Sequence, residues 1–522
     1  MLATVLSATL LGLDGRVIRV EVDVAPGLPG FTIVGLADAA LQEARERVRG
    51  AIRNAGFVHP PRRITVNLAP ADLRKAGSSL DLAIALGILL GSEQVRPAAG
   101  RLALIGELSL GGDVRPVPGV LPMVAVLARR GVRRVVVPRD TEDEARLVGG
   151  IEIVPVESLA AAVEVVRSTR SRRAPPRVPG RVDAAGGDRP SGPAIELLPE
   201  PFVPDLAEVR GQLEARRGLE VALAGGHGLL LVGPAGSGKT LLARTIPGLL
   251  PELDDDAALA ATVIASAAGI GPLRSLIRRP PFRAPHHTIS YAGMVGGGPR
   301  MSPGEATLAD HGVLFLDELP EFSRDVLEAL RQPLEEARVE VVRVGRATTF
   351  PARFQLVAAM NLCPCGMAGS DDRPCACPPS VPERYARRVS GPFRDRIDLW
   401  VVMPRVPAAA LVAAAAPESS AVVAARIAAA RERQLGRPPG RLNARVSGRT
   451  LRALCRLDAL AERRAVEMSE LERLSGRGTE RLLRVARTIA DLEASPAVLA
   501  HHLEEAARYR SQSSLLQQRI AV

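Results

Sequence analysis

The chain of 522 residues is poor in aromatic side chains, in cysteine and in long apolar runs. With 1 Trp, 3 Tyr and 9 Phe, it has too few rings for extensive stacking on nucleic-acid bases. Five cysteines are too few for a disulfide scaffold, so a cytoplasmic protein is expected. No run reaches the ~18 apolar residues of a membrane span, and no basic segment precedes the apolar N-terminus. The sequence therefore predicts neither a membrane partner nor a signal peptide.

Lysine is almost absent, since the 68 basic residues are 66 Arg and only 2 Lys, at positions 75 and 239. Against 57 acidic residues the formal net charge is +11, and a basic balance favours nucleic acid as a partner. A chain in which arginine replaces lysine, and in which Ala, Gly and Pro abound, is equally typical of a GC-biased genome. The charge alone therefore leaves both interpretations open.

Periodicity and composition divide the chain into four segments. Residues 1–167 alternate strand-like and helix-like stretches, which predicts a compact unit of mixed α and β structure. Residues 168–200 hold six Pro among many Arg and Gly and predict a flexible interdomain linker. Residues 201–407 show a second α/β pattern, whereas residues 417–512 are almost wholly helical in pattern. The fold class expected for the whole chain is α/β.

A phosphate-binding loop follows the short apolar strand predicted over residues 228–232. The loop precedes a helical stretch, and its eight residues match the pattern G-x-x-x-x-G-K-[ST]. Its glycines let backbone N–H groups converge on phosphates, its lysine is expected to reach the β- and γ-phosphates of ATP, and its threonine to bind Mg²⁺. An arginine fork cannot replace a compact ammonium there, so one of only two lysines stands where the chemistry requires it. The predicted cofactor-binding residues are Gly233, Pro234, Ala235, Gly236, Ser237, Gly238, Lys239 and Thr240.

Two later strand ends carry residues that are expected to complete an ATPase. Residues 313–318 (VLFLDE) predict an apolar strand that ends in two acids. Asp317 is expected in the Mg²⁺ shell, and Glu318 is expected to activate the attacking water. Residues 355–360 (QLVAAM) predict a further strand, and Asn361 at its end is a candidate to orient that water.

Arg396 lies near another predicted strand end, within the segment SGPFRDRID. It is a candidate arginine finger, a residue that reaches the nucleotide bound by a neighbouring subunit. An ordinary surface ion pair with Asp395 or Asp398 is the alternative interpretation.

Four of the five cysteines fall within 15 residues, as two Cys-x-Cys pairs separated by nine residues. Four thiolates suit a tetrahedral Zn²⁺ site, although the usual spacing within each pair is C-x₂-C. A bound Zn²⁺ and reduced free thiols are both compatible with the pattern. The candidate metal ligands are Cys363, Cys365, Cys375 and Cys377.

Taken in order, these motifs resemble the ComM/YifB family of magnesium-chelatase-like AAA+ ATPases over nearly the whole chain. Long matching segments are 281–290 (PFRAPHHTIS), 330–335 (LRQPLE) and 486–492 (ARTIADL). The resemblance implies an N-terminal domain like the proteolytic domain of Lon, a central P-loop AAA+ ATPase domain and a C-terminal helical lid. It also implies a homo-oligomeric ring, a hexamer, that acts on DNA as a branch-migration helicase in recombination.

By the same resemblance Arg477 is the sensor-2 arginine, and residues 209–212 lie near the adenine. In related ring helicases a hairpin at the place of residues 338–346 faces the pore, so its three arginines either contact DNA phosphates or are solvated. The histidine pair at 286–287 lies in a matching segment and is either a metal or phosphate contact or a structural feature.

Two other functions compete with a DNA motor. The Lon-like segment carries Ser78 and Ser79 where Lon-type enzymes have their nucleophile. The dyad of such enzymes needs a general-base lysine about 40 residues downstream, where this chain has none, and arginine cannot deprotonate. A peptidase is therefore not expected, and both serines are interpreted as caps of the following helix. A chelatase-like ATPase that remodels a protein or a metal-insertion complex remains, because it uses the same phosphate loop.

Overall fold

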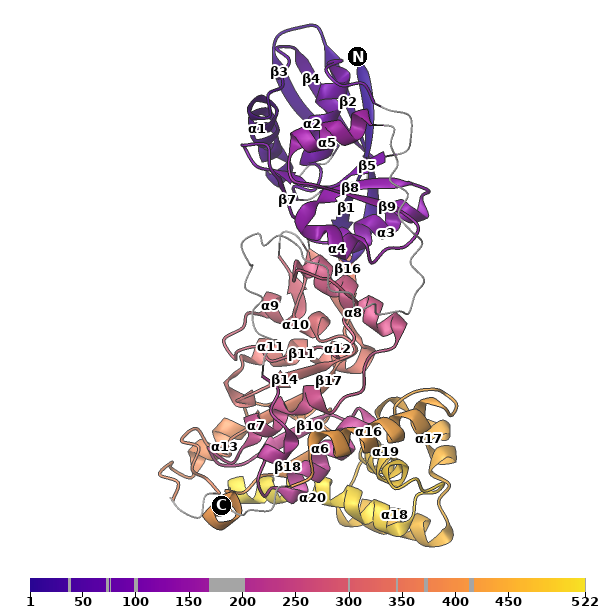
Figure 1. Ribbon diagram of the computed structural model, residues 1–522. Coiled ribbons are helices and arrows are strands. Elements are labelled where there is room, and N and C mark those ends of the chain that lie inside the picture. The colour runs from indigo at the N-terminus through magenta and orange to yellow at the C-terminus, as the bar shows by residue number, and fades with distance from the viewer. Residues whose placement is uncertain are drawn as a thin grey trace.

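The computed structural model describes residues 1–35, 39–71, 75, 77–97, 102–168, 202–298, 301–343, 346–369, 374–412 and 417–521. The linker predicted over residues 168–200 lies, apart from Ser168, outside the described residues and stays a prediction. Figure 1 shows an elongated molecule in which an N-terminal sheet, a second sheet and the C-terminal helices follow one another. Among the described residues there is no helix that combines the length and the apolar character needed to cross a membrane.

A seven-stranded mixed sheet organises the N-terminal segment. Its strands are β1 (Leu2–Leu11), β2 (Asp14–Ala25), β3 (Gly30–Val34), β4 (Arg63–Ala69), β5 (Leu102–Leu104), β8 (Arg134–Pro138) and β9 (Glu152–Val156). They lie in the order β3-β4-β2-β1-β5-β8-β9, with antiparallel pairs β1–β2 and β2–β4 and otherwise parallel pairs. A separate two-stranded ribbon joins β6 (Glu107–Leu108) and β7 (Val114–Arg115). The helices are α1 (Ala39–Asn54), α2 (Asp81–Gly91), α3 (Val120–Arg129), α4 (Glu142–Ala145) and α5 (Leu159–Arg167).

The serines at the start of α2 do not cap it. The helix begins after Leu80 without a side-chain cap. The Ser78 hydroxyl donates instead to the carboxylate of Glu107, and the Ser79 hydroxyl donates to the carbonyl of Ala8 over 3.2 Å. The prediction that both serines are capping residues was wrong, because neighbouring strands offer them acceptors that the local sequence pattern does not reveal.

A five-stranded parallel sheet organises the second α/β segment. Its strands are β10 (Leu229–Val232), β11 (Phe282–Arg283), β14 (Val313–Leu316), β17 (Gln355–Met360) and β18 (Leu399–Val402). They lie in the order β11-β14-β17-β10-β18, and every neighbouring pair is parallel. Strands β10, β14 and β17 are buried at every position, as expected of a parallel sheet covered on both faces. The strands predicted over 228–232, 313–318 and 355–360 are confirmed, and their carboxyl ends meet at one edge.

Short helices and two hairpins surround this sheet. The helices are α6 (Leu213–Gly225), α7 (Lys239–Arg244), α8 (Asp255–Ala268), α9 (Tyr291–Val295), α10 (Glu305–Leu308), α11 (Arg324–Ala329), α12 (Arg331–Glu336), α13 (Ser380–Ala386), α14 (Gly391–Arg394) and α15 (Ala408–Val412). The hairpins pair β12 (Gly296–Gly297) with β13 (Ser302–Pro303), and β15 (Arg338–Arg343) with β16 (Arg346–Pro351). The second of these confirms the hairpin predicted at residues 338–346.

One of the three arginines of that hairpin has a described side chain. Arg338 forms ion pairs with Glu336 at 3.1 Å and with Glu340 at 3.3 Å. The side chains of Arg343 and Arg346 lie outside the described residues. A contact between these arginines and DNA phosphates therefore stays a prediction.

The N-terminal unit docks on the second domain through α3, α4 and α8. The backbone N–H of Gly119 donates to the carbonyl of Ser266 over 2.8 Å. The Ser266 hydroxyl donates to the carboxylate of Glu144 over 2.5 Å, and the backbone N–H of Leu121 donates to the same carboxylate over 2.9 Å. Burial at this junction raises the pKa of Glu144, and the two hydrogen bonds counteract part of that rise.

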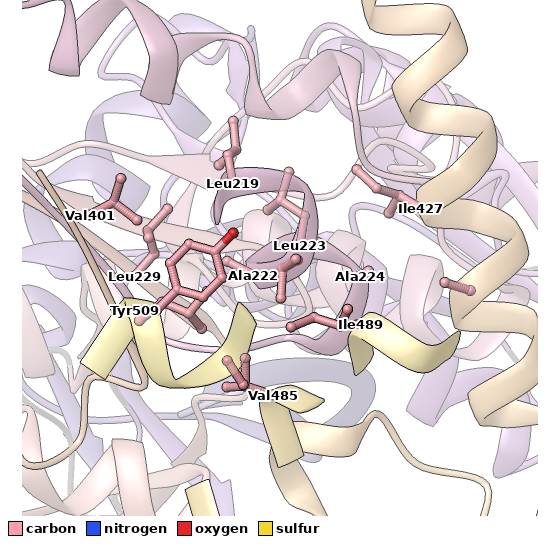
Figure 2. Packing of buried hydrophobic residues seen from close by; sticks show 14 of the residues in the cluster. Leu219, Ala222, Leu223, Ala224, Leu229, Val401, Ile427, Val485, Ile489 and Tyr509 are labelled. Atoms are coloured by element: carbon pink, nitrogen blue, oxygen red, sulfur yellow. The ribbon is translucent and has the colours of Figure 1, made fainter. Parts of the chain in front are cut away.

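The C-terminal helices share one hydrophobic core with the second domain. They are α16 (Ser420–Leu435), α17 (Gly448–Cys455), α18 (Ala459–Leu471), α19 (Gly476–Leu492) and α20 (Ala500–Ala521). Figure 2 shows α6 at the centre of this core, where it meets side chains from the other helices and from β18. The contributing residues include Leu219, Ala222 and Leu223 of α6, Ile427 of α16, Val485 and Ile489 of α19, Tyr509 of α20 and Val401 of β18.

A cluster of buried ion pairs fixes the C-terminal helices, the predicted lid, relative to one another. Asp491 of α19 is 1 % exposed and accepts a two-pronged contact from Arg437, at 2.7 and 2.6 Å. It also accepts from Arg487 at 2.9 Å and from the side-chain amide of Asn443 at 2.8 Å. The segment ARTIADL therefore has a structural purpose, because its arginine and aspartate satisfy each other inside the lid.

Replacing Asp491 by Ala is expected to destabilise the lid by about 3–5 kcal/mol, because it leaves a buried arginine without its counter-ion. Hydrogen exchange of the α19 amides in the full chain measures the effect. Glu467→Ala is the matched control, since its ion pair with Arg464 is largely exposed and worth less than about 1 kcal/mol. Equal protection of α19 in the two variants would contradict the cluster's role.

Candidate nucleotide-binding site

The phosphate loop joins the carboxyl end of β10 to α7. The backbone N–H of Gly233 donates to the carbonyl of Met360, the last residue of β17, over 3.2 Å. A Cβ atom on Gly233 would lie 2.1 Å from the carbonyl oxygen of Met403. Gly236 and Gly238 have φ angles of +77° and +92°, which glycine adopts without strain. The path of the loop between the strand ends thus depends on glycine at three positions.

The Lys239 side chain lies inside the loop and is only 7 % exposed as a residue. Its ammonium donates to the carbonyls of Gly233 and Pro234 over 2.9 and 2.8 Å, and to the Ser237 hydroxyl over 3.3 Å. Burial lowers the pKa of Lys239 to about 8, although the nearby Asp317 carboxylate raises it in part. The ammonium is therefore placed where phosphate oxygens can replace its carbonyl partners.

Thr240 and Asp317 meet across the gap between α7 and β14. The Thr240 hydroxyl donates to one Asp317 carboxylate oxygen over 2.6 Å. The other carboxylate oxygen accepts the backbone N–H of Glu318 over 2.9 Å. Mg²⁺ prefers hard oxygen ligands and is usually held by one or two protein groups together with substrate phosphates. The two side chains fit that requirement, and they are the residues that would hold the ion.

Glu318 projects from the end of β14 beside a histidine that the sequence left unassigned. Its φ of +52° is left-handed, and its side chain is 55 % exposed. The Nδ1 atom of His287 lies 3.4 Å from the Glu318 carboxylate, and the ring of His286 lies 4.1 Å from the ring of His287. His287 also presents its ring to Phe322 edge-on, at 6.5 Å between ring centres. His287 thus contacts the candidate general base, a contact that no spacing rule in the sequence predicts.

Asn361 stands at the tip of β17, between the other two strand ends. It follows Met360, whose carbonyl accepts a hydrogen bond from the phosphate loop. Because β17 lies between β10 and β14, Asn361 is placed between the loop and the Asp317–Glu318 pair. Its role in orienting water stays a prediction.

Within a single chain, the two arginines that are predicted to take part in catalysis contact other groups or lie exposed. Arg396 contacts the carbonyl of Pro392 and the carboxylate of Glu335, rather than Asp395 or Asp398. Arg477 lies exposed in the first turn of α19. Among the described residues no hydrogen bond or ion pair joins Arg477 to the phosphate loop, so both arginine roles stay predictions.

Gln212 supports the loop from the side on which the adenine is expected. It has a left-handed φ of +53° and immediately precedes α6. Its side-chain amide donates to the carbonyl of Ser237 over 3.1 Å and to that of Pro404 over 2.5 Å. The residue thereby fixes the loop against the segment after β18.

A basic cavity of about 720 Å³ opens beside the strand end that carries Glu318. One acid, Glu321, lines it and pairs with Arg388 at 2.9 Å. The arginines that line it are Arg324, Arg384, Arg387 and Arg388. The sequence shows these arginines only as members of separate segments.

The four predicted cysteine ligands converge in space. The Sγ atoms of Cys363, Cys365 and Cys375 lie 3.2 to 3.6 Å from one another, and that of Cys377 completes a group within 4.8 Å. All four are free thiols, so no disulfide accounts for the cluster. The turn that carries the first pair also reaches the phosphate loop, because the Ala235 N–H donates to the Gly366 carbonyl over 2.8 Å.

The Lys239 pKa of about 8 predicts that nucleotide affinity depends on pH. Only the ammonium form binds phosphate, and bound phosphate raises its pKa, so binding takes up a proton above that pH. Affinity for a fluorescent ADP analogue is expected to fall as the pH rises through about 8, by up to about tenfold per unit, and to change little between about pH 7 and pH 8, where the ADP phosphates stay ionised. Equilibrium titrations across this range measure it. An affinity that does not fall between about pH 8 and pH 9 would contradict the lowered pKa of Lys239.

Models of known protein families match most of the chain. The model described as magnesium chelatase, subunit ChlI, matches residues 205–411. The model described as subunit ChlI of Mg-chelatase matches residues 20–141, and the one described as the C-terminal part of that subunit matches residues 417–510. The phosphate loop and its partner residues therefore fall within the first of these matches.

Relatives from bacteria match over almost the full length. The uncharacterised protein YifB of Escherichia coli (strain K12) is 42 % identical over 524 residues, which span 99 % of this chain and 98 % of YifB. The competence protein ComM of Haemophilus influenzae is 39 % identical over 529 residues, or 99 % of each chain. An archaeal Lon protease of Halobacterium salinarum is 33 % identical over 93 residues, 17 % of this chain and 13 % of the protease.

These matches agree with the architecture. The N-terminal α+β unit is similar to part of the Lon proteases, and the parallel sheet with its phosphate loop is the magnesium-chelatase-like AAA+ unit. On these grounds the chain belongs to the ComM/YifB family of magnesium-chelatase-like AAA+ proteins.

Proposed function

We propose that the chain is a Mg-ATP-hydrolysing ring motor that acts on DNA, as a branch-migration helicase in recombination or transformation. The observation that carries the proposal is the meeting of four candidate functional groups at one edge of the parallel sheet. They are Lys239, the Thr240–Asp317 pair, Glu318 and Asn361. The relative that is a competence protein supports DNA as the molecule on which the motor acts.

The residues divide the chemistry among them. Lys239 exchanges its carbonyl partners for phosphate oxygens, and Thr240 and Asp317 hold Mg²⁺, which neutralises charge on the phosphates when bound. Glu318, exposed at the strand end, accepts the proton of the attacking water, and His287 orients its carboxylate. Asn361 holds the same water from the neighbouring strand end.

Arg396 completes the site of a neighbouring subunit in a homo-oligomeric ring, a hexamer by family resemblance. In the single chain its guanidinium is held by Glu335 and by the Pro392 carbonyl. It must exchange these partners for a phosphate oxygen to act as a finger. Such an exchange would tie hydrolysis to the arrangement of adjacent subunits.

The basic cavity beside Glu318 is the surface that we assign to the DNA backbone. Four arginines line one open cavity, and two of them, Arg387 and Arg388, would exchange ion pairs with Glu383 and Glu321 for phosphate oxygens. Such contacts carry no base-specific pattern. Binding there would be independent of sequence and sensitive to salt. Its position near Glu318, the proposed general base, would let DNA influence hydrolysis.

The alternative is a chelatase-like ATPase that remodels a protein or a metal-insertion complex. The match to the magnesium-chelatase family favours it. It requires the same phosphate chemistry but no response to DNA, so the two functions differ in one measurable property.

The four cysteine thiolates are further proposed to hold a structural Zn²⁺. The edges of a tetrahedron with Zn–S bonds of about 2.3 Å are about 3.8 Å long. Three Sγ–Sγ distances of 3.2 to 3.6 Å are close to that value. Small outward shifts of the side chains are enough to admit the ion.

Forked and single-stranded DNA are expected to raise the steady-state ATPase rate severalfold at low salt, and less as salt increases. Lys239→Ala should lose nucleotide binding, whereas Glu318→Gln should keep it and lose about a hundredfold or more in turnover.

Arg384→Ala with Arg387→Ala should weaken DNA binding without changing the DNA-free rate, and Arg463→Ala, on the exposed face of α18, is the matched control. No stimulation by any DNA together with no gel shift at low salt would reject the motor and leave the chelatase-like alternative.

Arg396→Ala and Glu318→Gln are each expected to be inactive alone and to regain activity when mixed. In a mixed ring, the intact Arg396 of one chain meets the intact Glu318 of its neighbour and completes that site. The measurement is the ATPase rate against mixing ratio, with Lys239→Ala mixed with Glu318→Gln as the comparison. An arginine that acts only within its own chain would give no recovery at any ratio.

A further inference from the structure

The cysteine cluster and the phosphate loop are joined by one backbone hydrogen bond. The Ala235 N–H donates to the carbonyl of Gly366 over 2.8 Å. Gly366 in turn donates its own N–H to the carbonyl of Cys363 over 3.0 Å. Two consecutive backbone contacts therefore connect a candidate metal ligand to the loop that is expected to bind phosphates.

The contact between the two loops is close. Gly366 has a left-handed φ of +75°, and a Cβ atom added there would lie 3.0 Å from the Cβ of Ala235. The Asn361 side-chain nitrogen would lie 3.8 Å from the same added atom. The turn thus packs against both the loop and the strand end, so a methyl group at Gly366 would push against Ala235 and would also be strained by the left-handed φ.

The thiols determine the shape of this turn. Cys363 is fully buried, and its Sγ accepts the backbone N–H of Ala368 over 3.2 Å. The Cys365 Sγ lies 3.2 Å from that of Cys363 and 3.5 Å from that of Cys375, and the latter two are 3.6 Å apart. Because Gly366 follows Cys365 directly, any ion that fixes these sulfurs also fixes the carbonyl that holds Ala235.

We propose that the thiolate cluster is a metal-dependent clamp on the phosphate loop, so that bound Zn²⁺ preorganises the loop for nucleotide. The proposal rests on the Zn²⁺ site proposed above and adds a regulatory consequence. When the ion is present, Gly366 holds the loop at Ala235 and nucleotide binds to a loop that is already shaped. When the ion is lost, the turn relaxes, and the loop must be ordered at the expense of binding energy.

The expected loss is modest because it corresponds to one hydrogen bond and the order that accompanies it. Nucleotide affinity should become about tenfold weaker in zinc-free protein. The Cys375→Ser variant should bind nucleotide equally weakly, because it removes one zinc ligand. In the described residues this cysteine makes no contact with the phosphate loop, so the weaker binding would come from loss of the metal. Gly366→Ala should also weaken binding, but with zinc retained, because the added methyl group disturbs the contact without touching a thiol.

The test measures zinc content by mass spectrometry and the dissociation constant of a fluorescent ADP analogue on the same full-length samples. The samples are the wild type as purified, the wild type after chelation, the chelated wild type after ZnCl₂ is returned, Cys375→Ser and Gly366→Ala. Cys455→Ser is the matched control, because that cysteine is buried in the lid and away from the cluster. Removal and return of zinc in the wild type keep the proposal testable if a variant fails to fold.

The possible results distinguish the clamp from the two proposals on which it depends, the zinc site and the ATPase function. Weaker binding in zinc-free protein, restored by ZnCl₂, together with weaker binding in zinc-loaded Gly366→Ala, supports the clamp. Zinc present in the wild type, with equal affinity after its removal, overturns the clamp and keeps the zinc site. Wild type without zinc overturns both, and wild type that binds no nucleotide overturns the ATPase function itself.

Discussion

The placement of β17 between β10 and β14 is the constraint on which the candidate site depends. In the parallel register Val232 of β10 lies opposite Met360 of β17, and Leu316 of β14 lies opposite Ala358. The phosphate loop, Asn361 and the acidic pair therefore start within two residues of one another along the strand direction. These segments lie far apart in the sequence, and the hydrogen-bonded pairing of the three strands is what brings them together. A slip by one residue would exchange the two faces of β17, each of which packs against different neighbours, so packing on both sides of the sheet protects the site geometry.

Functional groups that belong to a motif of consecutive residues could be predicted from the sequence. Contacts between segments that are distant in the sequence could not. The strands, the phosphate loop, the acidic strand end and the four-cysteine cluster each show in a short pattern. Arg396 was given Asp395 or Asp398 as the alternative partner, yet it contacts Glu335, and Asp398 instead lies 3.3 Å from His227. The contacts of His287 with Glu318, and of Ser78 with Glu107, follow the same rule, since nothing in the spacing of these residues reveals which strand ends become neighbours.

Helix α6 connects the nucleotide site to the lid. At its start, Gln212 holds the phosphate loop through the Ser237 carbonyl. Along its length, Arg217 forms an ion pair with Glu505 of α20 at 2.8 Å, and its apolar face packs on α16 and α19 (Figure 2). Helix α6 is therefore linked to the loop through the residue that precedes it, and it packs on α19, the helix that carries Arg477. A shift of the loop on nucleotide binding would reach the lid through α6, which gives a physical path for the predicted sensor arginine to respond.

The two lysines of the chain stand at positions where arginine does not take the place of lysine. Both are buried: Lys75 is 0 % exposed and Lys239 is 7 % exposed. Lys75 donates to the carbonyl of Pro70, and Lys239 donates to the carbonyls of two loop residues. A guanidinium is planar, wider and has its donors fixed in a fork, so it does not fit where a narrow stem must deliver one compact charge to converging carbonyls. Arginine can replace lysine on a solvated surface at little cost, and the lysines that persist mark positions where geometry, rather than charge alone, sets the requirement.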